Sequence, residues 1–144
     1  MPDQAMSDAD AVLAANQEFY RAFAARDLAA MDAIWAKEAP VACIHPGWDA
    51  LVGREAVMES WAAILGGPGA PQIRCDAPRA FVLGPSAFVI CREVLEQQGW
   101  LIATNVFARE EGGWRMVHHQ AGPAAQPQPA PATPTSERPP GPLH

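Results

Sequence analysis

The main change in the period of the hydrophobic pattern along this chain falls close to Gly66-Gly67. Before that point apolar residues recur at helical spacing in three segments, with one short strand-like segment between the second and the third. After it they fall in short segments rich in β-branched and aromatic residues, separated by Gly and Pro turns. A chain with its helices first and its strands afterwards covers one face of a sheet with those helices. The sequence therefore predicts an α+β fold, a cone of three N-terminal helices packed on a strongly curved antiparallel sheet.

Helix boundaries are indicated by capping residues. Ser7 followed by acidic residues is a typical start for a first helix that runs to about Ala25. Asp27 can cap a second, shorter helix. A third helix is expected after Gly53, ending at Gly66-Gly67.

Strand composition appears in six segments. One is short and lies between the second and third helices, and the other five form a run of antiparallel hairpins. The expected strands are 41–45, 73–76, 80–83, 87–95, 100–109 and 114–121. Four residues that are expected to point outward from this sheet are apolar. They predict a homodimer in which the sheets of the two subunits pack against each other. These residues are Val89, Cys91, Val106 and Val117.

The 144 residues suit one domain with a sizeable core. Eight of the 15 prolines follow Gly122, among residues too small or too polar to bury much surface, so a disordered tail is expected there. We therefore divide the chain into a flexible N-terminus (1–7), a folded domain (8–122) and a Pro-rich tail (123–144).

Charge and cysteine content exclude several classes of partner. The net charge is -6 and the ten basic residues form no cluster, so a nucleic-acid partner is not expected. No apolar run approaches ~20 residues and no secretory signal is apparent, so no membrane partner and a cytoplasmic location are expected. Three cysteines without Cys-x-x-Cys spacing indicate free thiols, and no cofactor is predicted.

Polar residues on three strand-like segments are candidates for one pocket: His45, Asn105 and His118. A histidine near neutral pKa can accept and return a proton, and an asparagine amide can donate to an oxyanion. Alternation on the last strand turns His118 toward the pocket and His119 away from it, and a bulge in that strand would exchange the two. Adjacent strand histidines cannot easily share one ion, so no metal site is predicted.

Local motifs in their order resemble the nuclear transport factor two-like family, specifically its SnoaL-like and ketosteroid isomerase-like branch. The resemblance covers roughly Ala9 to Gly122. It is carried by Phe19-Tyr20-Arg21-Ala22-Phe23 with Arg26-Asp27-Leu28, by His45-Pro46 ahead of Gly53-Arg54-Glu55, and by Gly112 to His119. The resemblance implies a conical pocket between the curved sheet and the three helices.

Ketosteroid isomerases use a tyrosine, an aspartate base and a protonated aspartic acid. By spacing, the resemblance places these roles at Phe19 or Tyr20, at His45 and at Asn105. None of these three positions carries the expected residue unless the alignment is shifted, so steroid isomerisation itself is not predicted.

The prediction is a hydrophobic pocket for a small hydrophobic or semi-polar molecule, with possible acid/base catalysis of isomerase, lyase or hydrolase type by His45, His118 and Asn105. Whether the protein is an enzyme is left open, and the alternative is a non-catalytic ligand-binding or dimerising accessory protein. Six further residues are predicted to bind the substrate: Tyr20, Trp48, Trp61, Phe107, Met116 and Gln120.

Overall fold

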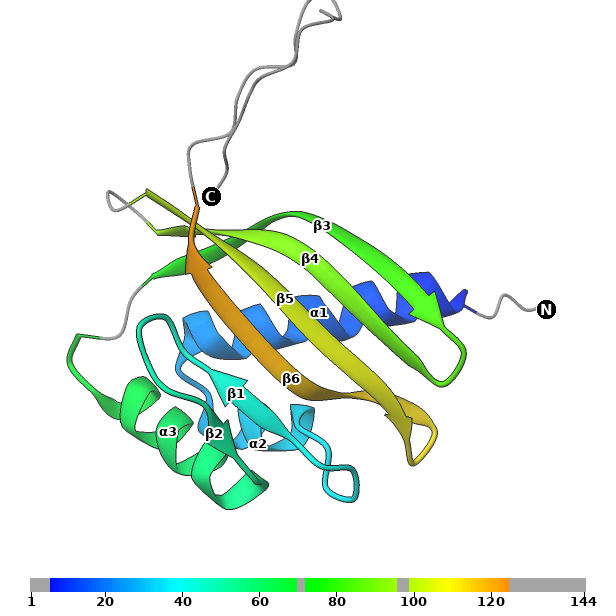
Figure 1. Ribbon diagram of the computed structural model, residues 1–144, viewed down its shortest axis with the longest axis horizontal. Helices are drawn as coiled ribbons and strands as arrows, with labels where there is room; N and C mark the ends of the chain where they lie inside the picture. Colours follow the sequence, from blue (N-terminus) through cyan, green and yellow to red (C-terminus); the bar gives the residue numbers. More distant parts are fainter. Residues whose placement is uncertain (1–5, 70–71, 96–98, 125–144) are drawn as a thin grey trace, which may run out of the picture.

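A computed structural model describes residues 6–69, 72–95 and 99–124. Three helices pack against a six-stranded sheet, which confirms the α+β class (Figure 1). No described helix combines the length and the apolar composition that a membrane crossing needs. The elements are α1 (Asp8–Ala25), α2 (Leu28–Ile34), β1 (Ala42–Ile44), β2 (Leu51–Val52), α3 (Arg54–Gly66), β3 (Ile73–Leu83), β4 (Ser86–Leu95), β5 (Gly99–Glu110) and β6 (Gly113–Pro123).

Both predicted N-caps are confirmed. The Ser7 hydroxyl accepts a hydrogen bond of 3.1 Å from the backbone N–H of Asp10, at the start of α1. Asp27 Oδ1 accepts one of 3.0 Å from the backbone N–H of Ala30, at the start of α2. Gly53 precedes α3 with φ 97°, a conformation that favours glycine. The predicted Pro-rich tail lies almost entirely outside the described residues.

The sheet has the strand order β2-β1-β6-β5-β4-β3. The predicted antiparallel pairing is confirmed for the long strands, whereas β1 pairs in parallel with β6. The predicted segments 73–76 and 80–83 form one strand, β3, with a register shift between Asp76 and Arg79. The interruption seen in the sequence is therefore a bulge and not a turn.

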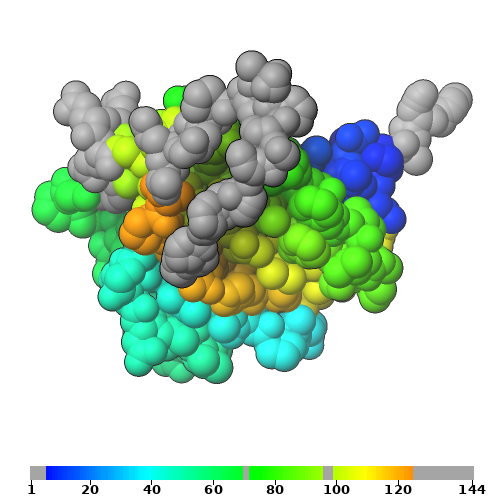
Figure 2. Space-filling view, turned by 45° about the horizontal axis from the view of Figure 1, so that its top comes forward, coloured from blue at the N-terminus to red at the C-terminus, as the bar shows by residue number. Residues whose placement is uncertain are grey.

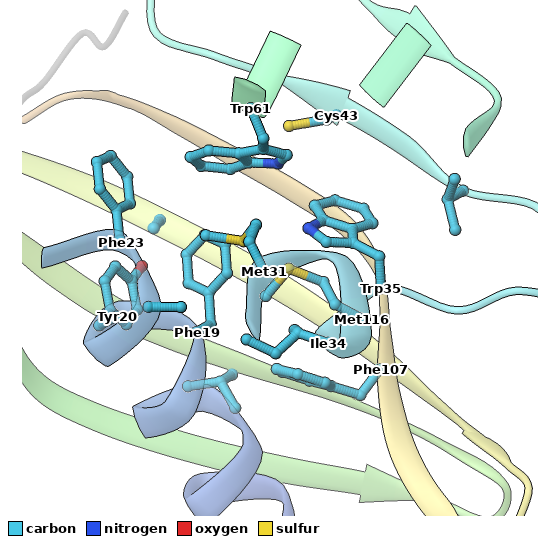
Figure 3. Packing of buried hydrophobic residues seen from close by; sticks show 14 of the residues in the cluster. Phe19, Tyr20, Phe23, Met31, Ile34, Trp35, Cys43, Trp61, Phe107 and Met116 are labelled. Carbon is cyan, nitrogen blue, oxygen red and sulfur yellow. The ribbon is translucent and has the colours of Figure 1, made fainter. Parts of the chain in front are cut away.

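The core lies between the inner face of the sheet and the helices. The predicted stripe of α1 is buried, including Phe19 and Phe23. Both rings meet Trp61 of α3 edge to face, with centroids 5.5 and 5.1 Å apart. Met31 of α2 and Met116 of β6 belong to the same buried cluster, which Figure 3 shows from close by. This aromatic and sulfur-rich packing fills the middle of the fold.

A bulge in β6 reverses the predicted orientation of the two neighbouring histidines. Phe107 pairs with Met116 while the preceding Val106 pairs with His118, so Val117 is an extra residue in β6. Met116 is buried, and after the bulge His119 is again inward and only 1% exposed. His119 therefore faces inward and His118 does not, which corrects the expectation from unbroken alternation and is the exchange that a bulge in this strand produces.

The outer face of the sheet also differs from the prediction. Val89 and Cys91 are 0% and 1% exposed because they point toward the helices. Their strand neighbours point outward instead, and the face they form has an apolar part around Phe88 and Ile90 and a charged part at Arg92. Figure 2 looks onto this face, with β3 and β4 in green beside β5 in yellow and β6 in orange. Phe81 and Phe88 stack on it, with ring centroids 4.8 Å apart.

Candidate active site

A cavity of about 260 Å³ lies where α1 and α3 end, against the ends of β4 and β5. Most of its wall is apolar, and the ionisable side chains that line it are Glu93, His45 and His119. Glu93 comes from β4, His119 from β6 and His45 from the turn after β1. A carboxyl group and two imidazoles in a small apolar cavity are the typical components of a proton-transfer site.

Glu93 is the carboxyl group that lines this cavity. Its side chain is 1% exposed, and burial raises the pKa of its carboxyl group to about 7. The Tyr20 hydroxyl donates a hydrogen bond of 2.6 Å to Glu93 Oε2. A carboxyl group with a pKa raised toward neutrality can hold a proton at physiological pH, which is the state that a general acid needs.

The hydrogen bonds of His119 determine which ring nitrogen carries its proton. His119 Nδ1 lies 2.6 Å from Asn105 Oδ1, while Asn105 Nδ2 donates to Asn16 Oδ1 at 2.8 Å and to the Tyr20 hydroxyl at 3.2 Å. Because Asn105 Oδ1 can only accept, His119 carries its proton on Nδ1 and leaves the Nε2 lone pair available. Burial lowers the pKa of His119 to about 3, and Nε2 lies 3.8 Å from Glu93 Oε2.

His45 is fixed in the opposite tautomer. Its Nε2 lies 2.9 Å from the Ser60 hydroxyl, and that hydroxyl donates its own proton to the carbonyl oxygen of Val57 at 2.7 Å. His45 therefore donates from Nε2 and keeps an acceptor lone pair on Nδ1. Burial lowers the pKa of His45 to about 4, so the ring is neutral at physiological pH. The two imidazole centroids are 6.4 Å apart.

Cys43 lies against His45 without forming a nucleophilic pair. Its Sγ is 3.7 Å from His45 Nε2, but burial raises the pKa of the Cys43 thiol to about 12. The thiolate is the reactive form, so this geometry does not support cysteine hydrolase chemistry.

The predicted catalytic residues divide into three cases. His45 lines the cavity. His118 lies outside it, and its Nδ1 is 3.0 Å from the carbonyl oxygen of Ala42. Asn105 is fully buried and both of its polar atoms are engaged, so it orients His119 and has no free N–H for an oxyanion.

Of the six predicted substrate-binding residues, Trp48 lines the cavity. Tyr20 reaches Glu93 from the side of α1 and does not line it. Gln120 is exposed, away from the cavity. The other three are fully buried core side chains: Trp61, Phe107 and Met116.

Sequence reasoning missed Glu93, although a signal for it exists. Glu93 continues the alternating series of Ala87, Val89 and Cys91 on β4, all of which are buried. A single carboxylate in phase with small apolar residues indicates a buried acid. The signal was hidden because the series was assigned to the outer face. Among the described residues, no group of three His, Cys, Asp or Glu side chains is arranged to hold a metal ion.

Comparisons with known proteins agree with this architecture. The model of the SnoaL-like domain family matches residues 12–126. A nuclear transport factor two-like protein from Streptomyces avermitilis, provisionally assigned as a dehydratase, is 29% identical with a TM-score of 0.71, over 79% of this chain and 94% of that chain. A domain from Thiobacillus denitrificans, provisionally assigned as a calcium/calmodulin-dependent protein kinase type II association domain, is 37% identical with a TM-score of 0.69, over 78% of this chain and 94% of that chain.

One curated relative is F-box protein SKIP8 of Arabidopsis thaliana, 30% identical over 112 residues. The alignment covers 77% of this chain but 48% of that protein, so the chain spans about half the length of this relative. The family model, in contrast, matches most of the chain and includes nearly all the described elements. The chain therefore belongs to the SnoaL-like domain family.

Proposed function

We propose that this protein is a lyase or isomerase that transfers protons at a carbon next to a carbonyl group of a small neutral molecule. The observation that carries the proposal is the cavity in which Glu93, with a pKa of about 7, lies beside the neutral bases His119 and His45. When one apolar site raises the pKa of one ionisable group and lowers that of another, the first can act as the acid and the second as the base. The resemblance to a provisionally assigned dehydratase supports the same chemistry.

For dehydration of a β-hydroxy carbonyl compound, His119 Nε2 takes the proton next to the carbonyl group. The electron pair of that C–H bond forms the C=C bond, and the C–O bond to the hydroxyl breaks. The Glu93 carboxyl group supplies the proton with which the hydroxyl leaves as water. His119 Nε2 and Glu93 Oε2 lie 3.8 Å apart, so His119 returns its proton to Glu93 through the water molecule that the reaction has released, which restores both groups without a co-reactant.

The remaining side chains hold this arrangement. Asn105 fixes the tautomer of His119, and Ser60 fixes that of His45. The free His45 Nδ1 can accept a hydrogen bond from a substrate hydroxyl. The apolar walls disfavour charged substrates, because a buried ion without a partner is costly.

The test is hydrogen exchange at carbon. A panel of cyclic ketones and β-hydroxy ketones is incubated with the protein in D₂O, and deuterium uptake and loss of water are followed by NMR. Glu93→Gln and His119→Gln are expected to slow the reaction about 100-fold or more, the usual contribution of a positioned acid or base. His118→Gln is the matched control on the same strand and is expected to retain activity. Full loss of water in Glu93→Gln, or full exchange at carbon in His119→Gln, would contradict the proposal.

A second candidate is a binding or association domain without catalysis, favoured by the 37% identity to the provisionally assigned association domain. Native mass spectrometry of the purified protein separates the two candidates. A retained small molecule that the protein binds and never converts would support the second candidate.

A further inference from the structure

The two oxygens of the Glu93 carboxyl group have different surroundings. Oε2 accepts the hydrogen bond of 2.6 Å from the Tyr20 hydroxyl and lies 3.8 Å from His119 Nε2. Oε1 accepts no hydrogen bond from any described residue. We infer that Tyr20 is a positioning residue, which keeps the proton of the Glu93 carboxyl group on Oε1. This placement concerns the protein alone, whereas its use in catalysis rests on the proposed function.

The hydrogen bonds of Asn105 set the direction of the Tyr20 hydroxyl proton. Asn105 Oδ1 lies 2.6 Å from His119 Nδ1, and Asn105 Nδ2 donates to the Tyr20 oxygen at 3.2 Å. Since that side of the phenol oxygen accepts an N–H, the hydroxyl proton points elsewhere. The Glu93 oxygen at 2.6 Å is a much better acceptor for it than Cys91 Sγ at 3.4 Å. Tyr20 is therefore the donor and Glu93 Oε2 the acceptor.

Glu93 Oε1 opens on the cavity. Glu93 lines this cavity and is 1% exposed. Among the described residues, the fully buried side-chain nitrogen and oxygen atoms without a hydrogen-bond partner are Trp35 Nε1 and Trp61 Nε1. Oε1 has no partner and is not one of these atoms, so it is not fully buried. It is therefore the carboxyl oxygen that a molecule in the cavity can reach.

A protonated carboxyl group has one hydroxyl oxygen, which donates, and one carbonyl oxygen, which is the better acceptor. The short bond from Tyr20 makes Oε2 the carbonyl oxygen and leaves the proton on Oε1. A proton on Oε2 would instead lie beside the lone pair of His119 Nε2. Tyr20 thus keeps the acid proton away from the neighbouring base and presents it to the cavity. Tyr20 does not line the cavity, so it acts through Glu93.

The same hydrogen bond opposes the effect of burial on Glu93. Burial raises the pKa of the carboxyl group, and the bond from Tyr20 lowers it because it stabilises the ionised form. The pKa of about 7 combines the two effects. Tyr20 therefore influences both the place of the proton and the ease of its release.

Infrared spectroscopy of the protein without substrate tests this placement. At about pH 5.5 ordinary carboxyl groups are ionised, so subtraction of the Glu93→Gln spectrum leaves the carbonyl stretch of protonated Glu93. A hydrogen bond to the carbonyl oxygen lowers that frequency, so Tyr20→Phe is expected to move the band upward. The midpoint of the titration of this band should rise by about one pH unit or more, the usual effect of losing a hydrogen bond to a charged group.

Incorporation of 3-fluorotyrosine is a second test, because Tyr20 is the only tyrosine of the chain and this hydroxyl alone is changed. Fluorination makes the phenol more acidic and therefore a stronger donor. The band and the titration midpoint should then move downward, opposite to their change in Tyr20→Phe. This measurement decides the question even where Tyr20→Phe fails to fold.

Cys91→Ala is the matched control, because it removes the other acceptor beside the same hydroxyl and leaves the bond to Glu93. The band and the midpoint should be unchanged in this variant. A band that keeps its frequency in Tyr20→Phe, or that moves equally in Cys91→Ala, would overturn the inference. A wild-type protein without this band would also overturn it. The expected shifts in a protein that catalyses neither exchange nor dehydration would refute the proposed function alone, and the reverse result would refute this inference alone.

Discussion

At the scale of single residues, Glu93 makes stability depend on pH. Its carboxyl group has a pKa of about 7 in the folded protein, against an ordinary value of 4.5. The folded state therefore holds this proton more tightly than the unfolded state does. The associated stabilisation is complete below about pH 4.5 and is lost as the pH rises through 7. His45 and His119 act in the opposite sense, because their lowered pKa values destabilise the fold when the pH falls below 6.5.

Glu93→Gln isolates the contribution of the carboxyl group. Between pH 4.5 and pH 8 the free energy of unfolding of the variant, relative to the wild type, is expected to rise by about 3 kcal/mol. The measurement is urea denaturation across this pH range. Glu59→Gln, on the exposed surface of α3, is the matched control and should leave the pH profile unchanged. A parallel profile for Glu93→Gln and the wild type would show that Glu93 titrates normally.

At the scale of elements, the bulge in β6 decides which histidine reaches the cavity. Trp114 and Met116 are inward before it, and His119 and Ala121 are inward after it. Val117 is the extra residue. Removing Val117 would leave Met116, His118 and His119 in regular alternation, with the same residues inward as before.

Two single-residue deletions test this account. Deletion of Val117 is expected to keep His119 bonded to Asn105, and so to keep a slowly exchanging Nδ1–H signal in NMR spectra. Deletion of Arg115 would move Met116 to the outer face and place Val117 in the core. The Arg115 deletion should therefore cost more, by about 2 kcal/mol of unfolding free energy. Equal losses, or loss of the His119 signal on deletion of Val117, would contradict the assigned bulge.

At the scale of the whole molecule, the outer face of the sheet is the predicted dimer surface. Phe81 and Ile102 are 38% and 42% exposed on this face, which also carries Phe88 and Val106. An apolar sheet face of this kind is typically covered by another element or by a second subunit. The surface therefore differs from the one predicted by alternation, although the dimer remains a prediction.

Sedimentation velocity at micromolar concentration is expected to show a dimer that Phe81→Glu converts to a monomer, because a charge would be buried beside Phe88 and Val106 without a partner. Val52→Glu introduces the same charge at a residue that is 76% exposed on β2, and it should leave the dimer intact. A wild-type monomer under these conditions would rule out the sheet-to-sheet dimer.

The sequence by itself determined the fold class, both helix caps and the buried stripe of α1. Each depends on neighbours within a few residues: a hydroxyl three residues before an N–H, or apolar side chains one helical turn apart. His45 in the cavity was also predictable, since a turn after a short strand places it at the edge of the sheet.

Three features were decided only by the tertiary structure: which side chains of β4 face the core, the bulge in β6 and the parallel pairing of β1 with β6. These features are set by register between distant segments, and one inserted residue reverses every side chain beyond it. The proposed acid/base site depends on all three, and Asn105 meets Asn16 across 89 residues of sequence. Contacts at that separation follow from how the strands pair and twist, which local propensity does not encode.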